Sequence, residues 1–203
     1  MPVFKKVLEQ KRNHYFTVIV SGLPRSGTSM MMRMLEAGGM KVVTDNVRKP
    51  NQDNPKGYYE FEKVKKIKDD ISWLDGCRGK AVKMVSELLY YLPPDRKYKV
   101  IFMRRRMIEI LASQKAMLER LGHKGADMTR EKLSDMFEKH LEKIDKWLLA
   151  QGNIDVLYIN YNDVVAHPRK NVNDLNKFFK NKLKVDQMCQ VVDTSLYRQR
   201  KAD

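Results

Sequence analysis

The sequence has little of several features that define other classes of protein. It contains two cysteines, Cys77 and Cys189, which lie far apart and lack the spacing of a metal site. Two lone thiols favour packing roles in a reducing compartment over a disulfide framework. No apolar run approaches the ~18 residues of a membrane span, and the N-terminus carries no apolar run of signal-peptide length. We therefore expect a soluble, cytoplasmic protein without a membrane span or a metal site.

Repeats, low-complexity tracts and linkers are also missing from the sequence. A chain of 203 residues without such boundaries predicts one domain over residues 1–203. The longest irregular stretch, residues 44–59, is rich in proline, asparagine and glycine. Irregular stretches of this length inside a domain are usually lids or binding loops, and a mobile surface loop is the alternative. Both interpretations remain open at this point.

Acidic residues are too few to balance the basic ones, since 40 lysines and arginines stand against 25 aspartates and glutamates, a net charge of +15. Such an excess implies an anionic partner, which can be a nucleic acid, a membrane surface or a highly charged small molecule. The sequence has no recognised nucleic-acid-binding motif, which disfavours the first of these. Residues 131–148, EKLSDMFEKHLEKIDKWL, carry both charges at helical spacing, which indicates a solvated helix face.

Five short apolar runs alternate with helical patterns along the chain. The predicted strands are residues 17–21, 41–43, 81–84, 99–103 and 156–160. The predicted helices are residues 28–37, 61–70, 107–121, 130–150 and 169–181. This alternation predicts an α/β fold, with a mostly parallel central sheet of about five strands and helices on both faces. Ligands of such sheets bind at the carboxyl ends of the strands, near the switch in strand order.

The stretch VIVSGLPRSGTSMMMRML, residues 18–35, has the pattern of a strand, a phosphate-binding loop and a helix. Gly22 and Gly27 have the spacing of the nucleotide-binding loop, but Thr28 stands where that loop carries its lysine. The sequence also lacks an obvious acidic residue to hold Mg²⁺. Both absences disfavour an ordinary ATPase or kinase.

The donors of this loop nevertheless predict an anion site. The backbone N–H groups of residues 25–29 are expected to point inward at a helix N-terminus, where unpaired donors and the helix dipole favour an anion. Arg25 adds a planar, permanently charged group suited to oxyanions. Hydroxyl donors are supplied by Ser26, Thr28 and Ser29.

A second basic motif lies in KVIFMRRRMIEILASQKAML, residues 99–118, where a buried strand is followed by three arginines and a helix. If Arg105 lies just before the helix, it can fold back while Ser113 points up from two turns in, so that both contact one phosphate. Arg104 and Arg106 can equally be exposed charges that flank the motif. Two anion sites at the ends of two neighbouring strands suit a ligand with phosphates at both ends.

Together these segments resemble the sulfotransferases that use 3′-phosphoadenosine 5′-phosphosulfate (PAPS), in particular a small, bacterial-type member. GLPRSGTS, residues 22–29, resembles the 5′-phosphosulfate loop of that family, in which tyrosylprotein-type members carry arginine in place of lysine. RRMIEILAS, residues 105–113, resembles its 3′-phosphate motif, an arginine with a serine eight residues later. Weaker similarities are found in KAVKMVSELLYYLP, YNDVVAHP and the terminal LYRQRK, so the resemblance spans residues 18–201.

The resemblance implies an enzyme that transfers a sulfuryl group in line from PAPS to a hydroxyl or amine, with adenosine 3′,5′-bisphosphate as the product nucleotide. The loop would hold the 5′ end of the cofactor, and Arg105 and Ser113 its 3′-phosphate. Met30 replaces the family tryptophan that stacks on adenine, so Tyr197 is the candidate for that contact. The implied cofactor-binding residues are Arg25, Ser26, Gly27, Thr28, Ser29, Arg105, Ser113, Tyr197 and Arg198.

The same resemblance implies the catalytic groups. Arg25 and Lys83 would stabilise charge on the transferring group, although Lys83 can equally be a strand-end lysine that faces solvent. The catalytic histidine of cytosolic members would fall near Val85, and none of the four histidines lies there, so the base is expected to be a carboxylate. Asp45, after the second strand, is the first candidate and Glu60 the second, with a turn or helix cap as the alternative role for Asp45.

Other functions remain open on the sequence alone. A P-loop kinase or nucleotide-binding protein with a degenerate loop would require Mg²⁺ and ATP. A non-catalytic anion-binding module would bind DNA or RNA with steep salt dependence and without preference for a 3′-phosphate. A sulfotransferase-like protein that has lost its base is a further possibility. For the acceptor, a small molecule or a saccharide, the basic charge favours an acidic one.

Overall fold

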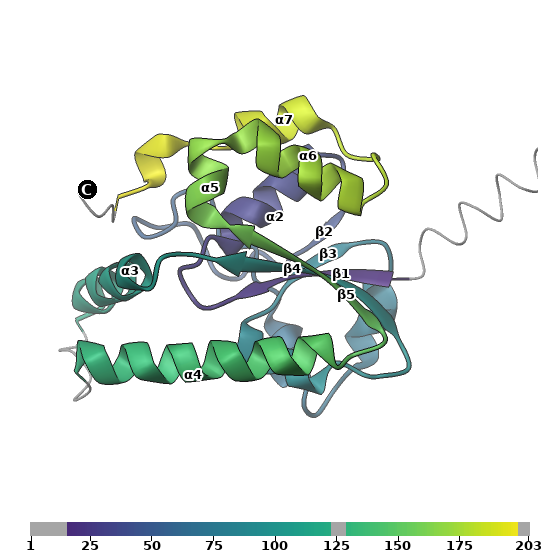
Figure 1. Ribbon diagram of the computed structural model, residues 1–203, viewed down its shortest axis with the longest axis horizontal. Coiled ribbons are helices and arrows are strands. Elements are labelled where there is room, and N and C mark those ends of the chain that lie inside the picture. The colour runs from purple at the N-terminus through teal and green to yellow at the C-terminus, as the bar shows by residue number, and fades with distance from the viewer. Residues whose placement is uncertain (1–15, 123–128, 199–203) are drawn as a thin grey trace, which may run out of the picture.

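The computed structural model describes residues 16–122 and 129–198, which form an α/β architecture (Figure 1). The central five-stranded sheet has the order β2-β3-β1-β4-β5, and every pair of neighbours is parallel. Its strands are β1 (Phe16–Gly22), β2 (Val42–Val43), β3 (Ala81–Lys83), β4 (Lys97–Arg104) and β5 (Ile154–Asn160). The predicted α/β fold with a parallel sheet is therefore confirmed.

Helices cover both faces of this sheet, as predicted (Figure 1). One face carries α2 (Thr28–Ala37), α5 (Tyr161–Ala166), α6 (Pro168–Phe178) and α7 (Val185–Gln190). The other carries α4 (Arg130–Leu149) and the 3-10 helices η1 (Glu62–Lys66), η2 (Ser72–Cys77) and η3 (Ser86–Tyr91). Two further helices, α3 (Met107–Arg120) and η4 (Thr194–Leu196), lie toward the carboxyl edge of the sheet, where their residues reach the site described below.

The central strand β1 explains why the sheet has two apolar cores. Val18, Ile19 and Val20 are all fully buried, and successive side chains of a strand point to opposite faces. Val18 and Val20 pack in the cluster formed with α2, whereas Ile19 packs in the cluster formed with α4 and the 3-10 helices. Burial of each such side chain contributes about 1.5–3 kcal/mol, so this strand holds the two layers together.

The helix predicted over residues 61–70 is wrong, because the chain forms only the five-residue 3-10 helix η1 there, followed by turns. Val64 and Ile67 are the buried residues of this stretch, at 4% and 1% exposure. They lie three residues apart, which is the repeat of a 3-10 helix, so one short turn buries both. The lysines around them leave no wider apolar face for an α-helix to bury.

Elsewhere the predicted elements are present with shifted ends. The helix predicted to reach residue 181 ends at Phe178, because Lys180 and Asn181 adopt left-handed backbone angles that terminate a helix. The strands predicted at 99–103 and 156–160 begin two residues earlier, at Lys97 and Ile154. The six-residue helices α5 and α7 were not predicted, since their length is too short for a helical repeat to be visible.

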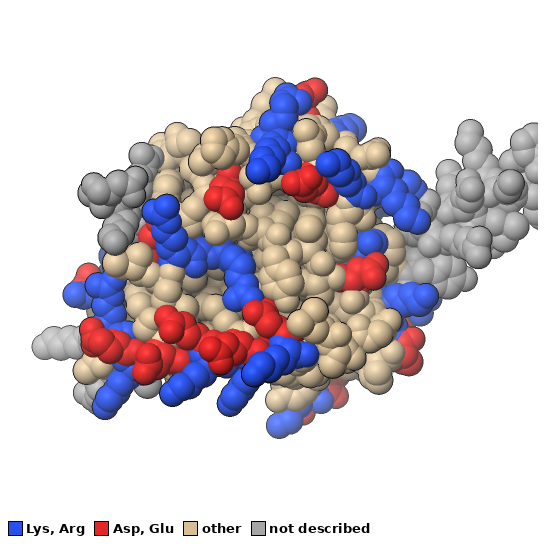
Figure 2. All heavy atoms as spheres, viewed as in Figure 1, with Lys and Arg blue, Asp and Glu red and all other residues tan. Residues whose placement is uncertain are grey.

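The charges of α4 form a solvated face, as predicted. Figure 2 shows acidic and basic side chains intermixed along this helix, which buries only Phe137, Ile144 and Leu148. This face therefore offers no purely basic surface for a nucleic acid. Within residues 16–122 and 129–198, no helix combines the length and apolar character that crossing a membrane requires.

Candidate functional site

The strand order brings the predicted motifs to one edge of the sheet. β1 lies between β3 and β4, and the three strands run parallel. Their carboxyl ends therefore deliver Gly22, Lys83 and Arg104 side by side, each followed by a candidate segment. The phosphate loop and the Arg105 motif are neighbours, as predicted for a ligand with two phosphates.

The loop between β1 and α2 requires glycine at both of its ends. Gly22 has φ +146°, and a side chain there would place its Cβ 2.5 Å from the carbonyl oxygen of Met103. Gly27 has φ +98°, and its Cβ would lie 2.4 Å from the ring of Tyr161. The two glycines let the loop pass against β4 and α5, so that the first turn of α2 opens toward the carboxyl edge of the sheet.

Gly27→Ala is expected to destabilise the protein by about 2–4 kcal/mol, because a left-handed backbone and an overpacked contact with Tyr161 combine. Urea unfolding measures this loss. Gly57→Ala is the matched control, since Gly57 has a similar φ of +93° but no atom of the described part of the chain within 4 Å of the place that a Cβ would take. In Gly57→Ala the free energy of unfolding should fall only by the cost of the left-handed backbone. Equal losses of stability in both variants would rule out a packing role for Tyr161 at the loop.

Direct hydrogen bonds join the phosphate loop to the second motif. Arg25 Nε donates to Ser113 Oγ at 2.9 Å, and Arg105 Nη1 donates to the Arg25 carbonyl oxygen at 3.0 Å. Ser113 is 6% exposed, and burial lowers the pKa of the Arg25 guanidinium although Asp53 opposes this effect. The structure thus brings together Arg25, Arg105 and Ser113, three of the residues predicted to bind the cofactor.

Arg105 is held by a buried carboxylate that the sequence analysis missed. Its Nε donates to Glu109 Oε2 at 3.0 Å, and the Glu109 side chain is 1% exposed. Glu109 also accepts hydrogen bonds from Asn162 Nδ2 at 2.9 Å and from the Tyr197 hydroxyl at 2.6 Å. The Arg105 guanidinium lies 4.6 Å from the centre of the Tyr161 ring. The spacing of four residues between Arg105 and Glu109 on one helix was the available signal.

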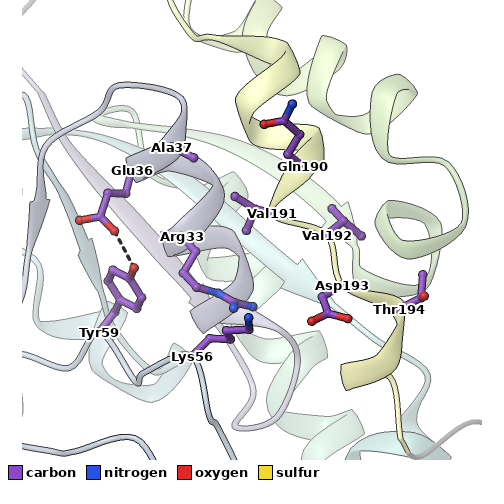
Figure 3. Close-up of a pocket in the computed structure, with 10 residues that line it drawn as sticks. All are labelled: Arg33, Glu36, Ala37, Lys56, Tyr59, Gln190, Val191, Val192, Asp193 and Thr194. Atoms are coloured by element: carbon purple, nitrogen blue, oxygen red, sulfur yellow. Dashed lines mark hydrogen bonds between the residues drawn. The ribbon is translucent and has the colours of Figure 1, made fainter.

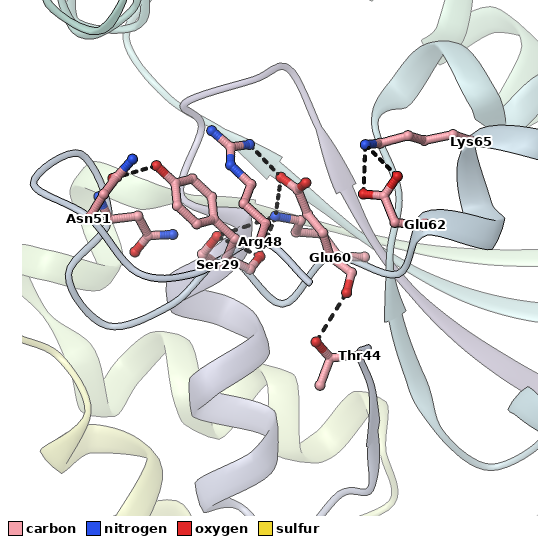
Figure 4. Close-up of polar contacts among 10 residues, drawn as sticks. Ser29, Thr44, Arg48, Asn51, Glu60, Glu62 and Lys65 are labelled. Carbon is pink, nitrogen blue, oxygen red and sulfur yellow. Dashed lines mark hydrogen bonds and ion pairs between the residues drawn. The ribbon is translucent and has the colours of Figure 1, made fainter. Parts of the chain in front are cut away.

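Lys83 and Glu60 form an ion pair beside Ser29 of the loop, and Figure 4 shows Glu60 with its second cation, Arg48. Lys83 Nζ lies 3.5 Å from Glu60 Oε1 and 3.4 Å from Ser29 Oγ, and it donates to the Tyr58 carbonyl oxygen. Glu60 Oε1 also accepts from Arg48 Nη1 at 2.8 Å. Burial lowers the pKa of Lys83 to about 8, although Glu60 acts in the opposite direction. Lys83 therefore does not face solvent, which removes the alternative role considered for it.

The carboxylate of Asp45 accepts hydrogen bonds from two backbone N–H groups. Its Oδ2 accepts from the Glu62 N–H at 2.6 Å, and its Oδ1 accepts from the Val47 N–H at 3.0 Å. Partial burial acts to raise the pKa of Asp45, but these two N–H groups outweigh it and hold the pKa below its usual value. Asp45 thus accepts from the first N–H of η1 and tightens the turn after β2, which matches the turn or cap role considered as its alternative.

A cavity of about 480 Å³ runs over the loop from Arg105 to Glu60. Most of the predicted site residues line it, namely Arg25, Gly27, Thr28, Ser29, Glu60, Lys83, Arg105, Ser113 and Arg198. The described residues around it do not include Asp45, Ser26 or Tyr197. Ser26 is fully buried, and its hydroxyl has no hydrogen-bond partner among the residues that the structure describes. Tyr197 donates its hydroxyl to Glu109, which also binds Arg105.

The positions of the family histidine and tryptophan both lie at this cavity. Val85 and Met30, the residues that stand in those two places, line it. His140 instead pairs its Nε2 with Ser86 Oγ at 2.8 Å, and His14 and His123 lie outside the described residues. Leu196 and Tyr161 also line the cavity, and these apolar or aromatic groups near the loop were not predicted.

A second cavity of about 640 Å³ lies between α2, Lys56 and the residues after α7 (Figure 3). Tyr59 donates to Glu36 Oε2 at 2.6 Å on its wall, and burial together with this bond raises the pKa of Tyr59 to about 12. Arg33 lines both cavities. Of the described residues around this second cavity, none is a predicted site residue.

Comparisons with known proteins bear on the family and the fold. The model of the sulfotransferase domain family matches residues 17–203. A solved sulfotransferase domain from the curacin biosynthetic pathway has 14% sequence identity and a TM-score of 0.51, and the match covers 88% of this chain and 78% of that chain. At this identity the likeness bears on the fold alone.

A crystal structure of retinol dehydratase in complex with androsterone and the inactive cofactor PAP is also similar, with 15% identity and a TM-score of 0.49. That match covers 88% of this chain and 63% of retinol dehydratase, so the chain spans less than two thirds of that protein. No curated protein matches the chain in sequence. Because the family model covers nearly the whole chain, the protein belongs to the sulfotransferase family and transfers sulfuryl groups.

Proposed function

We propose that the protein transfers the sulfuryl group of PAPS to an apolar alcohol, phenol or amine. The observation that carries this proposal is the hydrogen-bonded unit of Arg25, Arg105 and Ser113 at one edge of the sheet. An arginine that contacts both the loop and the second motif suits a ligand that carries phosphates at both its 5′ and 3′ positions. An ATP site would instead require the loop lysine that Thr28 replaces.

The residues present fit this cofactor. The two glycines let the loop pack closely on β4 and α5, and the cavity above the loop is lined by the cations Arg25, Lys83, Arg105 and Arg198. Ser29, Thr28 and Ser113 add hydroxyl donors around the same space. Polar donors and fixed positive charges of this kind bind phosphate and sulfate oxygens. When bound, PAPS supplies the sulfuryl group and a bisphosphate leaving group.

In this proposal Glu60, rather than Asp45, removes the proton from the acceptor. Its carboxylate lines the cavity beside Lys83, whereas both oxygens of Asp45 are engaged by backbone N–H groups. As the acceptor oxygen or nitrogen forms its bond to sulfur, its proton passes to a Glu60 oxygen. The bond between sulfur and the leaving phosphate oxygen breaks, and Lys83 and Arg25 stabilise the charge that develops there.

The acceptor class rests on the wall beside Glu60. This wall is apolar and consists of Phe61, Val64, Met84, Val85 and Leu88. Arg48 and Lys65 stand at the same end of the cavity with largely exposed side chains. An acceptor with an apolar body therefore fits better than a saccharide, and an anionic substituent on that body can reach these two cations.

The lone thiols Cys77 and Cys189 support a cytoplasmic location.

Calorimetric titration with adenosine 3′,5′-bisphosphate, ATP–Mg²⁺ and AMP at equal salt tests the proposal. The bisphosphate should bind most tightly, and Arg105→Ala should weaken its binding alone by about 1.5–3 kcal/mol, because a charge-assisted bond to the 3′-phosphate is lost. Ser113→Ala is included, since Arg105→Ala also leaves the buried Glu109 without its cation. Preference for ATP–Mg²⁺ would favour a kinase, and absence of nucleotide binding would favour an anion-binding module.

A further inference from the structure

The segment of residues 44–59, which we call the cover segment, lies against the donors of the cofactor site. Arg25 Nη2 donates to the Asp53 carbonyl oxygen at 3.2 Å, and Ser29 Oγ donates to the Tyr58 carbonyl oxygen at 3.2 Å. Arg198 Nη1 donates to the Gln52 carbonyl oxygen at 2.6 Å. Groups that the proposed function assigns to phosphates are thus paired with oxygens of the protein itself.

The side chain of Asp53 adds a negatively charged carboxylate beside these carbonyl oxygens. Its side chain is 5% exposed, forms an ion pair with Arg120 and acts electrostatically on Arg25. Burial of a carboxylate is unfavourable unless cations compensate for it. Arg120 binds this carboxylate, and Arg25 donates to the carbonyl oxygen of the same residue, so two arginines from different elements hold Asp53.

Arg120 lies on the same helix as Ser113, seven residues later, at the end of α3. Seven residues are close to two turns, so both side chains are on one face of the helix. Ala116 and Met117, which lie between them, line the cavity together with Ser113 and Arg120. The Asp53 carboxylate therefore sits at the end of the cavity where Ser113 and Arg105 are placed, and not at the Glu60 end.

We propose that Arg120 is a further residue for the 3′-phosphate of the nucleotide, and that the Asp53 carboxylate occupies this place in the free enzyme. The inference rests on the proposed function, because it takes the Arg105 and Ser113 end as the 3′-phosphate site. The nucleotide phosphate replaces the carboxylate on Arg120 as the cover segment shifts. The apparent affinity of the protein for the nucleotide is lower when Asp53 occupies the 3′-phosphate position in a larger fraction of molecules.

Internal hydrogen bonds hold part of the cover segment together. Asn51 Oδ1 accepts three hydrogen bonds, from the Asp53 N–H at 2.9 Å, the Asn54 N–H at 3.2 Å and the Tyr58 hydroxyl at 2.7 Å. These bonds stay within the segment, so they survive when its contacts to the arginines are exchanged for phosphate. Of the two interpretations of residues 44–59, the inference requires the binding loop.

Titrations with adenosine 3′,5′-bisphosphate and AMP test this inference in the full chain. Arg120→Ala should weaken bisphosphate binding by about tenfold and leave AMP binding within about twofold, because only the bisphosphate carries the 3′ group. Asp53→Asn, which keeps the shape of the side chain, should strengthen bisphosphate binding by about threefold, since the competing charge is gone.

Arg169→Ala and Asp186→Asn are the matched controls, because this exposed ion pair at 2.6 Å involves the same residue types and the same changes of net charge. Neither control should alter binding of either nucleotide. Equal weakening of the bisphosphate and AMP by Arg120→Ala would make Arg120 a structural support of the segment and overturn the inference. Weaker bisphosphate binding in Asp53→Asn would do the same, since Asp53 would then help the ligand.

The titrations distinguish failure of the proposed function from failure of the role proposed for Arg120. If the unmodified protein does not prefer the bisphosphate over AMP, the proposed function fails with the inference. If Arg105→Ala abolishes that preference while Arg120→Ala leaves it intact, the cofactor assignment stands and only the role of Arg120 is lost.

Discussion

Glu60→Gln is expected to lower kcat by about 100- to 1,000-fold, because glutamine keeps the size of the side chain but cannot accept the proton of the acceptor. The Glu60 carboxylate lies 2.8 Å from Arg48 and 3.5 Å from Lys83 and lines the cavity. These two cations hold the carboxylate in place at the wall of the cavity. Initial rates with saturating PAPS and a phenolic acceptor such as 2-naphthol measure the effect, and affinity for the bisphosphate should stay within about twofold.

Asp45→Asn is the matched comparison, since it makes the same chemical change in the other candidate for the base. Its two backbone contacts predict a loss of stability of about 1 kcal/mol, typical of a lost cap, with turnover nearly unchanged. The opposite pattern, with Asp45→Asn inactive and Glu60→Gln active, would return the role of base to Asp45. Loss of activity in neither variant would mean that another group, or the acceptor itself, carries the proton.

Lys83→Met is expected to lower kcat by about 100- to 1,000-fold, because a preorganised cation beside the transferring group is removed. The Lys83 side chain is 12% exposed, so water cannot readily replace its charge. Lys83→Arg keeps the charge and should retain much more activity than Lys83→Met. Comparable loss in both variants would indicate that packing at this position, and not its charge, is what the reaction requires.

The lowered pKa of Lys83 gives this prediction a pH dependence. The protonated amine is the form that attracts an anionic cofactor, and burial lowers its pKa to about 8 in the free enzyme. The value of kcat/KM for PAPS should therefore fall as the pH rises through about 8, since kcat/KM reports groups of the free enzyme. In Lys83→Arg this fall should disappear, because arginine stays protonated over the accessible range. A fall that persists in Lys83→Arg would assign it to a different group.

Much of the fold was readable from the sequence because its signals are local. A fully buried strand such as β1 needs a continuous apolar run, and the loop after it needs glycine at both ends. The same holds for Arg105 and Ser113, whose spacing on α3 is a property of the helix itself. The stretch at residues 61–70 was misread because its local pattern of Val64 and Ile67 suits more than one kind of helix.

The partners within the site could not be read in this way. Arg25 and Ser113 are 88 residues apart in the chain, Arg105 and Arg25 are 80 apart, and Arg120 and Asp53 are 67 apart. Nothing in the local pattern around an aspartate such as Asp53 says which arginine it will meet. Glu109 was overlooked for a related reason, since its burial depends on Asn162 and Tyr197 from distant segments.

The sequence by itself determined the parallel α/β sheet, the phosphate loop and the family, because apolar periodicity and glycine spacing act over a few residues. Only the tertiary structure distinguishes the surroundings of the two carboxylates considered as the base. It ties Asp45 to the backbone of Glu62 and Val47, and it places Glu60 beside Lys83 in the cavity. Both residues are acidic and follow β2, so the difference between them lies in which neighbours the folded chain brings within hydrogen-bond distance.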